Sequence, residues 1–442
     1  MRQKKSSPKT LLQEVHSLYS LKRAWANLNK SNIYSRGISE ITIKTFQANI
    51  EKNLKSIQKG LRKGNYKFSK LRGVPIHKNQ NNIPKIRPLR IPEIRDRIVI
   101  RAISDIITPI LENRYPINNE ASFAYRSGQS IEKVFLRIQK LFNEGNRVAF
   151  KTDICKFFDT VNQETLLKEL IFPELPDPSL NELLKKGLTL EIGNIDELSP
   201  FEMKAFEESS NGIPQGNALS PLLSNIYLAD FDQELLINNY GLVRYADDIV
   251  IMCKSKDDAM KAFNLCRSLL QNKHLEIYEL KSSDKTKISK IIFPTQEPLE
   301  YLSICFNGKN IWPTKSTFNS LKKKINELCI KDSSIRELLI SFEHLLRGWI
   351  AAFSFSDVER YFDKIDEGIN KSLVYALRKR DWKLKNLEDD KLSIMQRQFS
   401  GIPLCAEIMK DLKKCKKEIT SEITDSIKLK ETSENVWEVT SS

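Results

Sequence analysis

Residues 242–252 read Leu-Val-Arg-Tyr-Ala-Asp-Asp-Ile-Val-Ile-Met, and this stretch decides the fold. Two acids, Asp247 and Asp248, interrupt apolar and largely β-branched runs, which is the pattern of two buried strands joined by a tight turn. Neighbouring residues of a strand point to opposite faces, so both carboxylates can face one place only if they lie in the turn. Burying adjacent acids is costly unless a cation lies between them, and Mg²⁺ suits oxygen ligands. The alternative is an ordinary Asp-rich turn at the surface.

Length and composition limit the class of protein. With 442 residues, 40% of them hydrophobic, the chain can form two or three units with sizeable cores. No apolar run approaches the roughly 20 residues that span a bilayer and no signal peptide is visible, so we expect a cytoplasmic protein without a membrane partner. Seven Cys without a Cys-x-x-Cys pair and only four His argue against a zinc module. Apolar surroundings predict reduced, buried thiols at Cys155, Cys253 and Cys305.

Charge is unevenly distributed along the chain. Residues 1–150 contain 30 Lys and Arg against 10 Asp and Glu, a net charge of +20, whereas the remainder contains 41 against 46. A strongly basic N-terminal third indicates a polyanionic partner such as nucleic acid, and a solvated basic surface is the alternative. Residues 162–211 are the opposite, with 11 acids and four bases, and we expect them to form an acidic helical insert.

The spacing of apolar residues places the other elements. It predicts helices over residues 10–30, 39–63, 94–112, 130–143, 218–236 and 256–272, and over most of 316–430. Strand character begins at residue 147 and returns at 275–279, 288–293 and 300–306. The stretch 66–92 is basic, rich in Pro, and strand- or loop-like.

Three carboxylates and a glycine-rich turn form a candidate site. Asp153 ends an apolar strand-like run, where a carboxylate is out of place unless it is used, and it precedes Asp247 by 94 positions. The turn Gly212-Ile-Pro-Gln-Gly216 lies between them. Three carboxylates can hold two divalent ions about 4 Å apart, of which one lowers the pKa of an attacking 3′-hydroxyl and the other binds a triphosphate. This is the chemistry of nucleotidyl transfer, in which positioning and charge neutralisation supply most of the catalysis.

In this order, the motifs resemble those of reverse transcriptases, and specifically of the bacterial group II intron-like branch, over residues 40–385. Tyr245-Ala-Asp-Asp248 resembles the catalytic hairpin, and Asp153 with Phe157-Phe158-Asp159 resembles the first catalytic strand. The turn 212–216 and the helix after it resemble the segment beneath the incoming nucleotide and template. Leu346-Arg-Gly-Trp349 resembles part of the thumb or maturase region.

The resemblance implies an RNA-directed DNA polymerase with a right-hand α+β fold. Such a fold has a fingers and palm core with an antiparallel palm sheet, and an α-helical thumb and C-terminal domain. The chain would divide into a basic N-terminal tail and helix (1–38), fingers (39–150), palm (151–312) and helical thumb and C-terminal domain (313–442). The acidic insert 162–211 would project from the palm.

The resemblance also assigns roles to single residues. Catalysis falls to Asp153, Asp247 and Asp248, and binding of two Mg²⁺ ions, or Mn²⁺ in their place, to these three and Ile154. The dNTP would be bound by Lys85, Arg87, Arg126, Phe158, Gln215 and Lys285. The primer grip would comprise Tyr301, Leu302 and Ser303. The Phe158 ring would exclude a 2′-hydroxyl from the sugar site, and a Phe in the core is the alternative.

Three positions depart from the family pattern. Arg90 and Ser303 stand where Gly is usual, and Asn217 stands where Ser is common. None of them is a carboxylate, so we expect catalysis to persist while the fingers loop and template handling are specialised.

Two biological roles stay open. No segment resembles an HNH endonuclease, protease, RNase H or integrase, and the chain resembles bacterial defence-associated reverse transcriptases, which copy a dedicated non-coding RNA in antiphage defence. Its partners would then be that RNA, the DNA primer or product and dNTPs, with a second copy or another protein left open. The alternative is a group II intron-derived maturase that mainly binds intron RNA. A catalytically dead binding module is disfavoured because the three carboxylates and Lys285 are all present.

Overall fold

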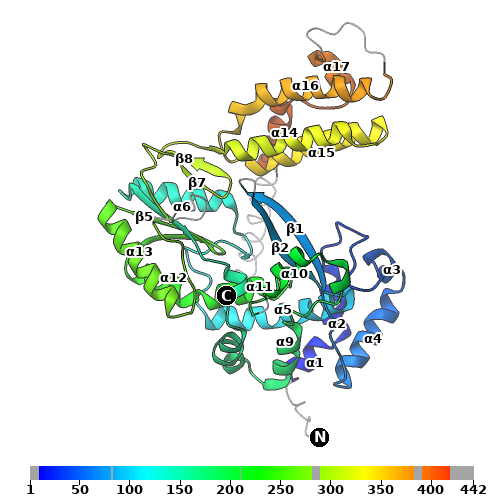
Figure 1. The fold of residues 1–442 in the computed structure, drawn as a ribbon, viewed down its shortest axis with the longest axis vertical. Helices are drawn as coiled ribbons and strands as arrows, with labels where there is room; N and C mark the ends of the chain where they lie inside the picture. Colours follow the sequence, from blue (N-terminus) through cyan, green and yellow to red (C-terminus); the bar gives the residue numbers. More distant parts are fainter. Residues whose placement is uncertain (1–8, 81–82, 210, 281–288, 383–390, 419–442) are drawn as a thin grey trace, which may run out of the picture. The chain divides into compact units, whose positions relative to one another are not determined.

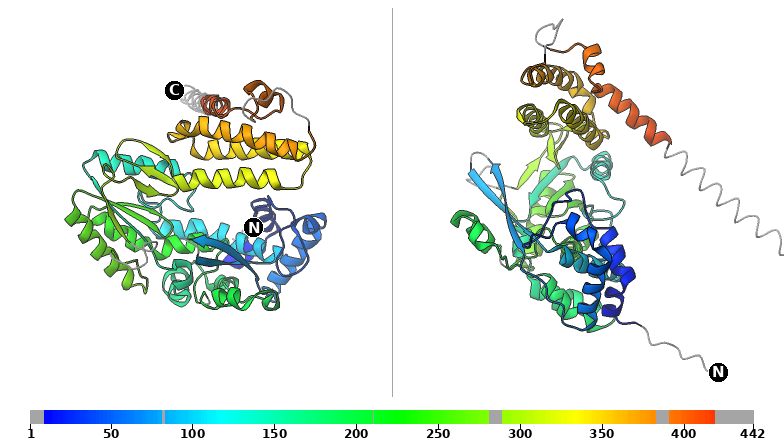
Figure 2. Two further views of the ribbon diagram at one scale, coloured as in Figure 1. Left: turned by 45° about the horizontal axis from the view of Figure 1, so that its top comes forward. Right: turned by 90° about the vertical axis from the view of Figure 1, so that its right-hand side faces the viewer.

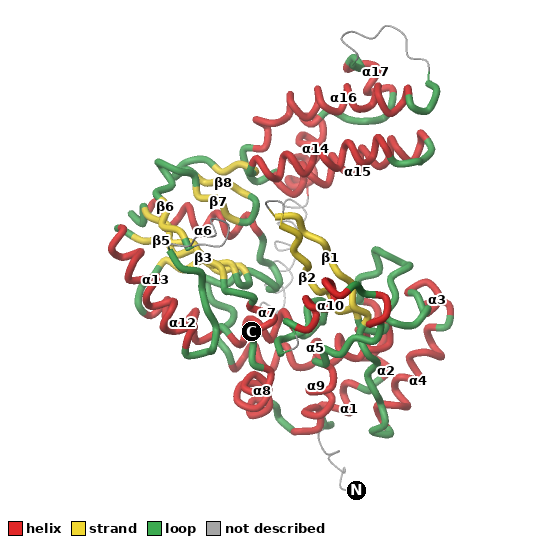
Figure 3. The backbone as a smooth tube through the Cα atoms, in the orientation of Figure 1, coloured by secondary structure: helices red, strands yellow, loops and turns green. Residues whose placement is uncertain are grey.

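The acids flanked by apolar runs belong to a four-stranded antiparallel sheet with the strand order β4-β5-β3-β6. Its strands are β3 (Val148–Asp153), β4 (Gly241–Tyr245), β5 (Asp248–Cys253) and β6 (Lys290–Ile292). Figure 3 distinguishes these strands from the helices around them. The antiparallel palm sheet and the α+β fold class that the sequence predicts are therefore confirmed.

This computed structural model describes residues 9–80, 83–209, 211–280, 289–382 and 391–418. The chain forms two compact units, Met1–Ile292 and Phe293–Ser442, shown in Figure 1. The boundary between the units lies within residues 151–312, the range expected for the palm.

Helices cover one face of the palm sheet. Phe150 of β3 packs edge to face on Phe263 of α13 (Lys256–Gln271), with ring centroids 5.8 Å apart. Because side chains alternate along a strand, Asp153 points to the opposite face. Asp248 shares that face, since it is the direct cross-strand partner of Asp153. The carboxylates thus lie on the side of the sheet away from α13.

The N-terminal part of the first unit consists of helices and one long hairpin. The predicted helix 10–30 is broken at Ser17, whose side chain accepts a hydrogen bond that starts α2. The predicted helix 39–63 begins only after Thr42, which caps α3, and is broken at Asn49 between α3 and α4. The observed elements are α1 (Leu11–Val15), α2 (Leu18–Ala26), α3 (Ile43–Ala48), α4 (Ile50–Arg62), β1 (Arg72–Gln80), β2 (Ile83–Ile91), α5 (Ile94–Arg114) and α6 (Ile131–Asn143).

The acidic insert, residues 162–211, packs on other parts of the first unit. It packs on the segment that leads into β1: Leu71 donates its N–H to the Glu191 carbonyl at 2.8 Å, and Gly193 donates to the Leu71 carbonyl at 2.9 Å. Leu71, Ile192 and Phe206 form a small buried cluster. The insert keeps enough apolar side chains to pack on the rest of the unit, although its composition is acidic. Its elements are α8 (Gln163–Thr165), η1 (Leu166–Ile171), η2 (Phe172–Glu174), η3 (Pro178–Leu180), α9 (Asn181–Gly187), η4 (Ile195–Glu197) and α10 (Pro200–Glu207).

Two further sequence predictions need correction. The helix expected over 218–236 is interrupted at Leu228, which separates α11 (Ser220–Tyr227) from α12 (Ala229–Ile237). The strand expected at 275–279 is reduced to a single bridge between Ile277 and Ile154. The first unit also contains the short helix α7 (Phe157–Thr160), which follows β3.

The second unit combines a small sheet with a helical bundle (Figure 2). The strands of this sheet are β7 (Leu299–Tyr301), β8 (Ile304–Phe306) and β9 (Ile311–Pro313), in the order β7-β8-β9. The turn residues Leu302 and Ser303 both have positive φ, +46° and +68°, as a type I′ hairpin turn requires. The helical elements are α14 (Lys315–Ile330), α15 (Ile335–Phe353), η5 (Val358–Tyr361), α16 (Phe362–Arg378), α17 (Ile394–Phe399) and helical residues 405–418.

Cysteine state and helix character agree in part with the sequence predictions. All seven cysteines are free thiols, and Cys253 and Cys305 are buried as predicted, whereas Cys155 is only partly buried. None of the helices in the described ranges has both the length and the apolar character needed to cross a membrane.

Candidate active site

The two acids of the hairpin occupy different structural positions. Asp247 lies in the two-residue turn, whereas Asp248 is the first residue of β5. The expectation that both lie in the turn is therefore wrong for Asp248. Its carboxylate meets that of Asp153 because the two residues are directly paired across β5 and β3. The other turn residue, Ala246, has a φ of +59°, a left-handed conformation that costs a non-glycine residue about 1–2 kcal/mol.

The turn is tied to the end of β3. The main-chain N–H of Ile154 donates to the Asp247 carbonyl at 3.1 Å. The carboxyl group of Asp247 also lies close enough to that of Asp153 for its charge to raise the Asp153 pKa. The structure thus brings together all three carboxylates that the sequence predicts to be catalytic.

Burial and mutual repulsion make these groups hard to ionise. Burial raises the pKa of Asp153, and the nearby charges of Asp247 and Asp248 raise it further, to about 8. Burial also raises the pKa values of Asp247 and Asp248. Arg87 and Lys151 oppose these shifts, Arg87 at Asp247 and Lys151 at the other two acids.

The donor chemistry of the site fits divalent cations. Three carboxylates that repel one another provide hard oxygen ligands, and a cation would relieve the repulsion that raises the Asp153 pKa. Ile154 is 1% exposed and its side chain is apolar, so only its main-chain carbonyl could contribute. In the described part of the chain, no three acidic, His or Cys side chains already form a metal-ligand group.

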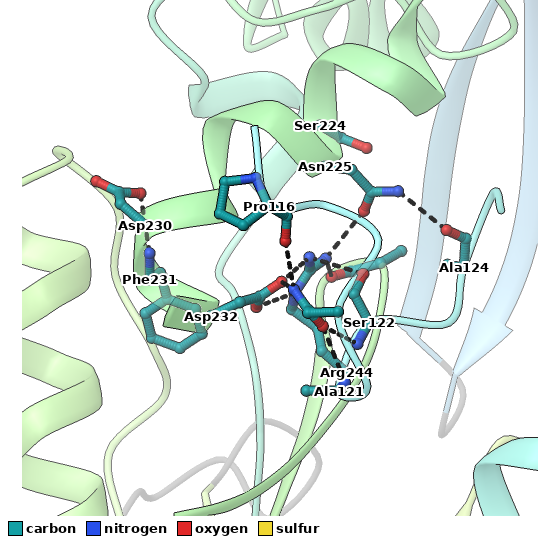
Figure 4. A network of polar contacts seen from close by, with 12 residues as sticks. Pro116, Ala121, Ser122, Ala124, Ser224, Asn225, Asp230, Phe231, Asp232 and Arg244 are labelled. Atoms are coloured by element: carbon teal, nitrogen blue, oxygen red, sulfur yellow. Dashed lines mark hydrogen bonds and ion pairs between the residues drawn. The ribbon is translucent and has the colours of Figure 1, made fainter. Parts of the chain in front are cut away.

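The buried side chain of Arg244 is the centre of a polar network (Figure 4). Arg244 pairs with Ile249, the residue after Asp248, so it lies on the opposite face of the sheet from the Asp248 carboxylate. Arg244 donates through Nε and Nη2 to the two carboxylate oxygens of Asp232, at 2.6 and 2.5 Å, and both side chains are fully buried. It donates further to the Ala246 carbonyl at 2.9 Å, to Oδ1 of Asn225 at 3.2 Å and to Oγ of Ser122 at 2.9 Å. Arg244 thereby links α12, α11 and the 122 loop to the turn that carries Asp247.

The predicted triphosphate ligands are only partly described. Arg87 is exposed on β2, and its charge lowers the pKa of Asp247, so the structure places it near the carboxylates. Lys85 pairs with Lys78 in the hairpin, but its side chain is outside the described set. Lys285 lies outside the described residues. One residue near the carboxylates, Tyr125, was not identified from the sequence. Its pKa is raised by burial and by the charge of Asp247, and its backbone has a positive φ of +62°.

Arg126 is engaged within its own loop. Its Nη1 donates to the main-chain carbonyls of Asn119, at 2.6 Å, and Ser122, and its Nε donates to Oδ1 of Asn118 at 3.1 Å. These bonds shape the loop whose Ser122 contacts Arg244. The structure therefore gives Arg126 a supporting position, and its predicted contact with a nucleotide stays a prediction.

Phe158 and Gln215 belong to two segments in close contact. The Phe158 carbonyl accepts a hydrogen bond from the Ile213 N–H at 2.7 Å. A Cβ at Gly212 would lie 1.8 Å from that carbonyl oxygen, so only glycine permits this approach. Phe157 is buried, whereas the Phe158 ring beside it is only half-buried, which disfavours the alternative of a core Phe for Phe158.

The predicted primer-grip residues belong to the second unit. Tyr301 is 1% exposed and ends β7, and Leu302 and Ser303 form the turn to β8. The Ser303 carbonyl accepts a hydrogen bond from Thr314 at 2.9 Å, which ties the turn to the start of α14.

Replacing Arg244 with Met is expected to lower the free energy of unfolding of the first unit by about 3–5 kcal/mol, because Asp232 would stay buried without its partner. Chemical denaturation followed by fluorescence measures the loss. Arg267→Met is the control: it breaks an exposed pair with Glu279 and should cost less than about 1 kcal/mol. Equal losses in the two variants would contradict the assigned importance of the buried pair.

The raised pKa of Asp153 predicts that the metal-free protein loses stability as pH rises. The folded state retains this proton up to about pH 8, whereas the unfolded chain releases it near 3.8, so the folded state binds more protons in between. The loss is at most about 1.4 kcal/mol per pH unit for one proton. Asp153→Asn should therefore gain Tm relative to the unchanged protein as pH rises from 5 to 9 in EDTA. A Tm difference that is constant across this range would refute the expectation.

Comparison with known proteins supplies the family. A model described as reverse transcriptase (RNA-dependent DNA polymerase) matches residues 76–306, and a model of the group II intron maturase-specific domain matches 318–397. The chain is 29% identical over 302 residues to Protein YkfC of Escherichia coli (strain K12), covering 60% of this chain and 74% of YkfC.

Two further matches are partial. The chain is 30% identical over 211 residues to the group II intron-encoded protein LtrA of Lactococcus lactis subsp. cremoris, covering 46% of this chain but only 32% of LtrA. A solved structure, the partial Cas6-RT-Cas1–Cas2 complex, is 28% identical with a TM-score of 0.35, and the match covers 60% of this chain and 42% of that chain. The reverse transcriptase model alone covers more than half of the sequence, and on that match the chain belongs to the reverse transcriptase family, with a maturase-specific segment following the polymerase region.

Proposed function

We propose that this reverse transcriptase extends a primer by two-metal nucleotidyl transfer at Asp153, Asp247 and Asp248. The observation that carries the proposal is the direct pairing of Asp153 with Asp248 across β3 and β5, with Asp247 held beside them by the hydrogen bond from the Ile154 N–H to its carbonyl. In the reaction, the 3′-oxygen of the primer forms a bond to the α-phosphorus of the dNTP, and the bond to pyrophosphate breaks. Two divalent ions, when bound, would lower the pKa of the 3′-hydroxyl and neutralise charge on pyrophosphate.

The chain's own residues supply position and charge. The pairing of β3 with β5 holds Asp153 and Asp248 opposite each other. The hydrogen bond from Arg244 to the Ala246 carbonyl holds the turn that contains Asp247. Arg87 lies near these acids and is suited to the triphosphate, as a guanidinium donates to phosphate oxygens in a fixed geometry. We propose that Lys85, Lys285 and Arg126 add to this cationic binding, and that Gln215 lies beneath the nucleotide.

Phe158 is proposed to select deoxyribonucleotides by steric exclusion of the 2′-hydroxyl. Phe158→Ala should raise the relative kcat/KM for ribonucleotides by about tenfold or more, because the space beside C2′ is then open. Primer extension with each nucleotide type measures the ratio. Phe157→Leu is the control, since this neighbouring ring is in the core and its loss should reduce stability without changing sugar selection. Unchanged sugar selectivity in Phe158→Ala would remove the assignment.

The proposed template is a cognate RNA. The net charge of +20 in residues 1–150 supports binding to many phosphates of a folded RNA. The resemblance to defence-associated enzymes supplies the biological setting of this proposal, in which a dedicated non-coding RNA is copied into DNA during antiphage defence.

A second candidate function is supported by the match of residues 318–397 to the maturase-specific domain of group II introns. In this alternative the chain binds intron RNA and promotes its splicing, and polymerisation is secondary. The two candidates differ in whether function requires the carboxylates.

The deciding experiment purifies the protein with its associated RNA, sequences that RNA, and then adds dNTPs and Mg²⁺. We expect one small RNA and cDNA copied from it, and no cDNA from the Asp247→Ala/Asp248→Ala variant. Intron RNA, with splicing preserved in the same variant, would instead establish the maturase function. Absence of cDNA on any added primer and template would overturn the polymerase mechanism proposed here.

A further inference from the structure

Arg90 of β2 is buried in the acidic insert rather than exposed on the hairpin. Its side chain is 2% exposed and makes hydrogen bonds with three separate positions of the insert. Nε donates to the Leu190 carbonyl at 3.0 Å, Nη2 to the Phe206 carbonyl at 2.8 Å, and Nη1 to Oγ of Ser209 at 2.8 Å. The guanidinium also lies over the Phe206 ring, 5.3 Å from its centroid.

The other strand of the hairpin is held by the same insert. Gly73 of β1 exchanges two hydrogen bonds with the Asn194 side chain: its N–H donates to Oδ1 at 2.7 Å, and its carbonyl accepts from Nδ2 at 3.0 Å. A Cβ at Gly73 would lie 3.1 Å from the Phe206 ring, so the strand and the insert are in close contact. Residues 190–209 therefore form hydrogen bonds with both strands of the β1–β2 hairpin.

Arg90 also connects the insert to the glycine-rich turn. Its main-chain N–H donates to the Gln215 carbonyl at 3.2 Å. A Cβ at Gly216 would lie 3.1 Å from the Arg90 carbonyl oxygen. Asn217, just after the turn, donates through Nδ2 to the Gly187 carbonyl in α9 at 2.8 Å. The two departures from the family pattern in this unit, Arg90 and Asn217, thus both contact the insert.

The hydrogen bonds of the Arg90 side chain fix the hairpin more firmly than apolar packing alone would. A buried guanidinium is costly unless its donors are paired, and here the partners are fixed main-chain carbonyls and one hydroxyl, which define its position in three directions. The exposed pair of Lys70 and Glu191 joins the same two segments, but ion pairs in solvent contribute little. The link that fixes the hairpin is therefore the buried one.

We propose that Arg90 is a positioning residue for nucleotide binding: held by the insert, it fixes the β1–β2 hairpin against the 212–216 turn so that Arg87 and Gln215 meet the incoming dNTP together. This inference rests on the proposed polymerase function. Arg87 is three residues before Arg90 on the same strand, and Gln215 accepts the Arg90 main-chain hydrogen bond, so a displacement of Arg90 moves both.

The test is single-nucleotide incorporation on a primed RNA template with the full-length protein. Arg90→Met should raise the KM for dNTP by about tenfold or more, as expected when charged hydrogen bonds are lost, while kcat changes by less than about threefold. Arg90→Lys should give an intermediate KM, because an ammonium can satisfy only part of the carbonyl set. Lys70→Met is the matched control and should keep the KM of the unchanged protein.

A structural role alone would lower the fraction of active enzyme, and with it kcat, at constant KM. That pattern, or a KM raised equally in Lys70→Met, would overturn the inference. A second variant, Asn194→Ala, removes the hydrogen bonds to Gly73 of β1 and leaves Arg90 unchanged, so it tests the inference even if Arg90→Met fails to fold. A raised KM for dNTP with kcat retained in Asn194→Ala supports the inference, and an unchanged KM overturns it. An unchanged protein that incorporates no nucleotide would instead refute the proposed function.

Discussion

Repulsion among three carboxylates is the constraint on which the rest of the first unit depends. Asp153, Asp247 and Asp248 share one side of the palm sheet, and burial makes each of them resist ionisation. Such an arrangement persists only when the surrounding structure determines it. The determining contacts lie on the opposite face, where Arg244 binds Asp232 with two hydrogen bonds and holds the Ala246 carbonyl. The left-handed backbone of Ala246 is tolerated because the guanidinium fixes the turn around it.

The palm strands could be predicted from sequence because their signal is local. Apolar runs on both sides of the acids define β4 and β5, and a run that ends in Asp153 defines β3. The spacing of apolar residues does not show where a helix breaks when the helical segments on both sides of the break keep the same spacing. The break between α1 and α2 depends on the Ser17 side chain, which accepts a hydrogen bond from Ser20, and many serines occur without such a role.

Long-range partners were the other limit of sequence reasoning. An arginine within an apolar strand indicates a buried acid nearby, yet nothing local identifies Asp232 rather than another acid as that partner. The contacts of the insert are hidden from sequence reasoning for a related reason. The charged residues of the insert mostly face water and therefore say little about where the insert packs. Its position is set by a few apolar and amide side chains, such as Phe206 and Asn194. Of the candidate site, the sequence alone singles out the three carboxylates and Arg87, which the structure places near one another, and it does not identify the residues that support them.

The grip of the insert on the β1–β2 hairpin has a consequence for the evolution of this chain. A mutation that removed the insert would expose the Arg90 guanidinium and the Gly73 amide, and a mutation of Arg90 would leave the Leu190 and Phe206 carbonyls without their donor. Each change alone leaves buried polar groups without partners, so we expect the two segments to be retained or lost together, although about 100 residues separate Arg90 from its partners. Transfer of the insert into another polymerase would succeed only together with the arginine.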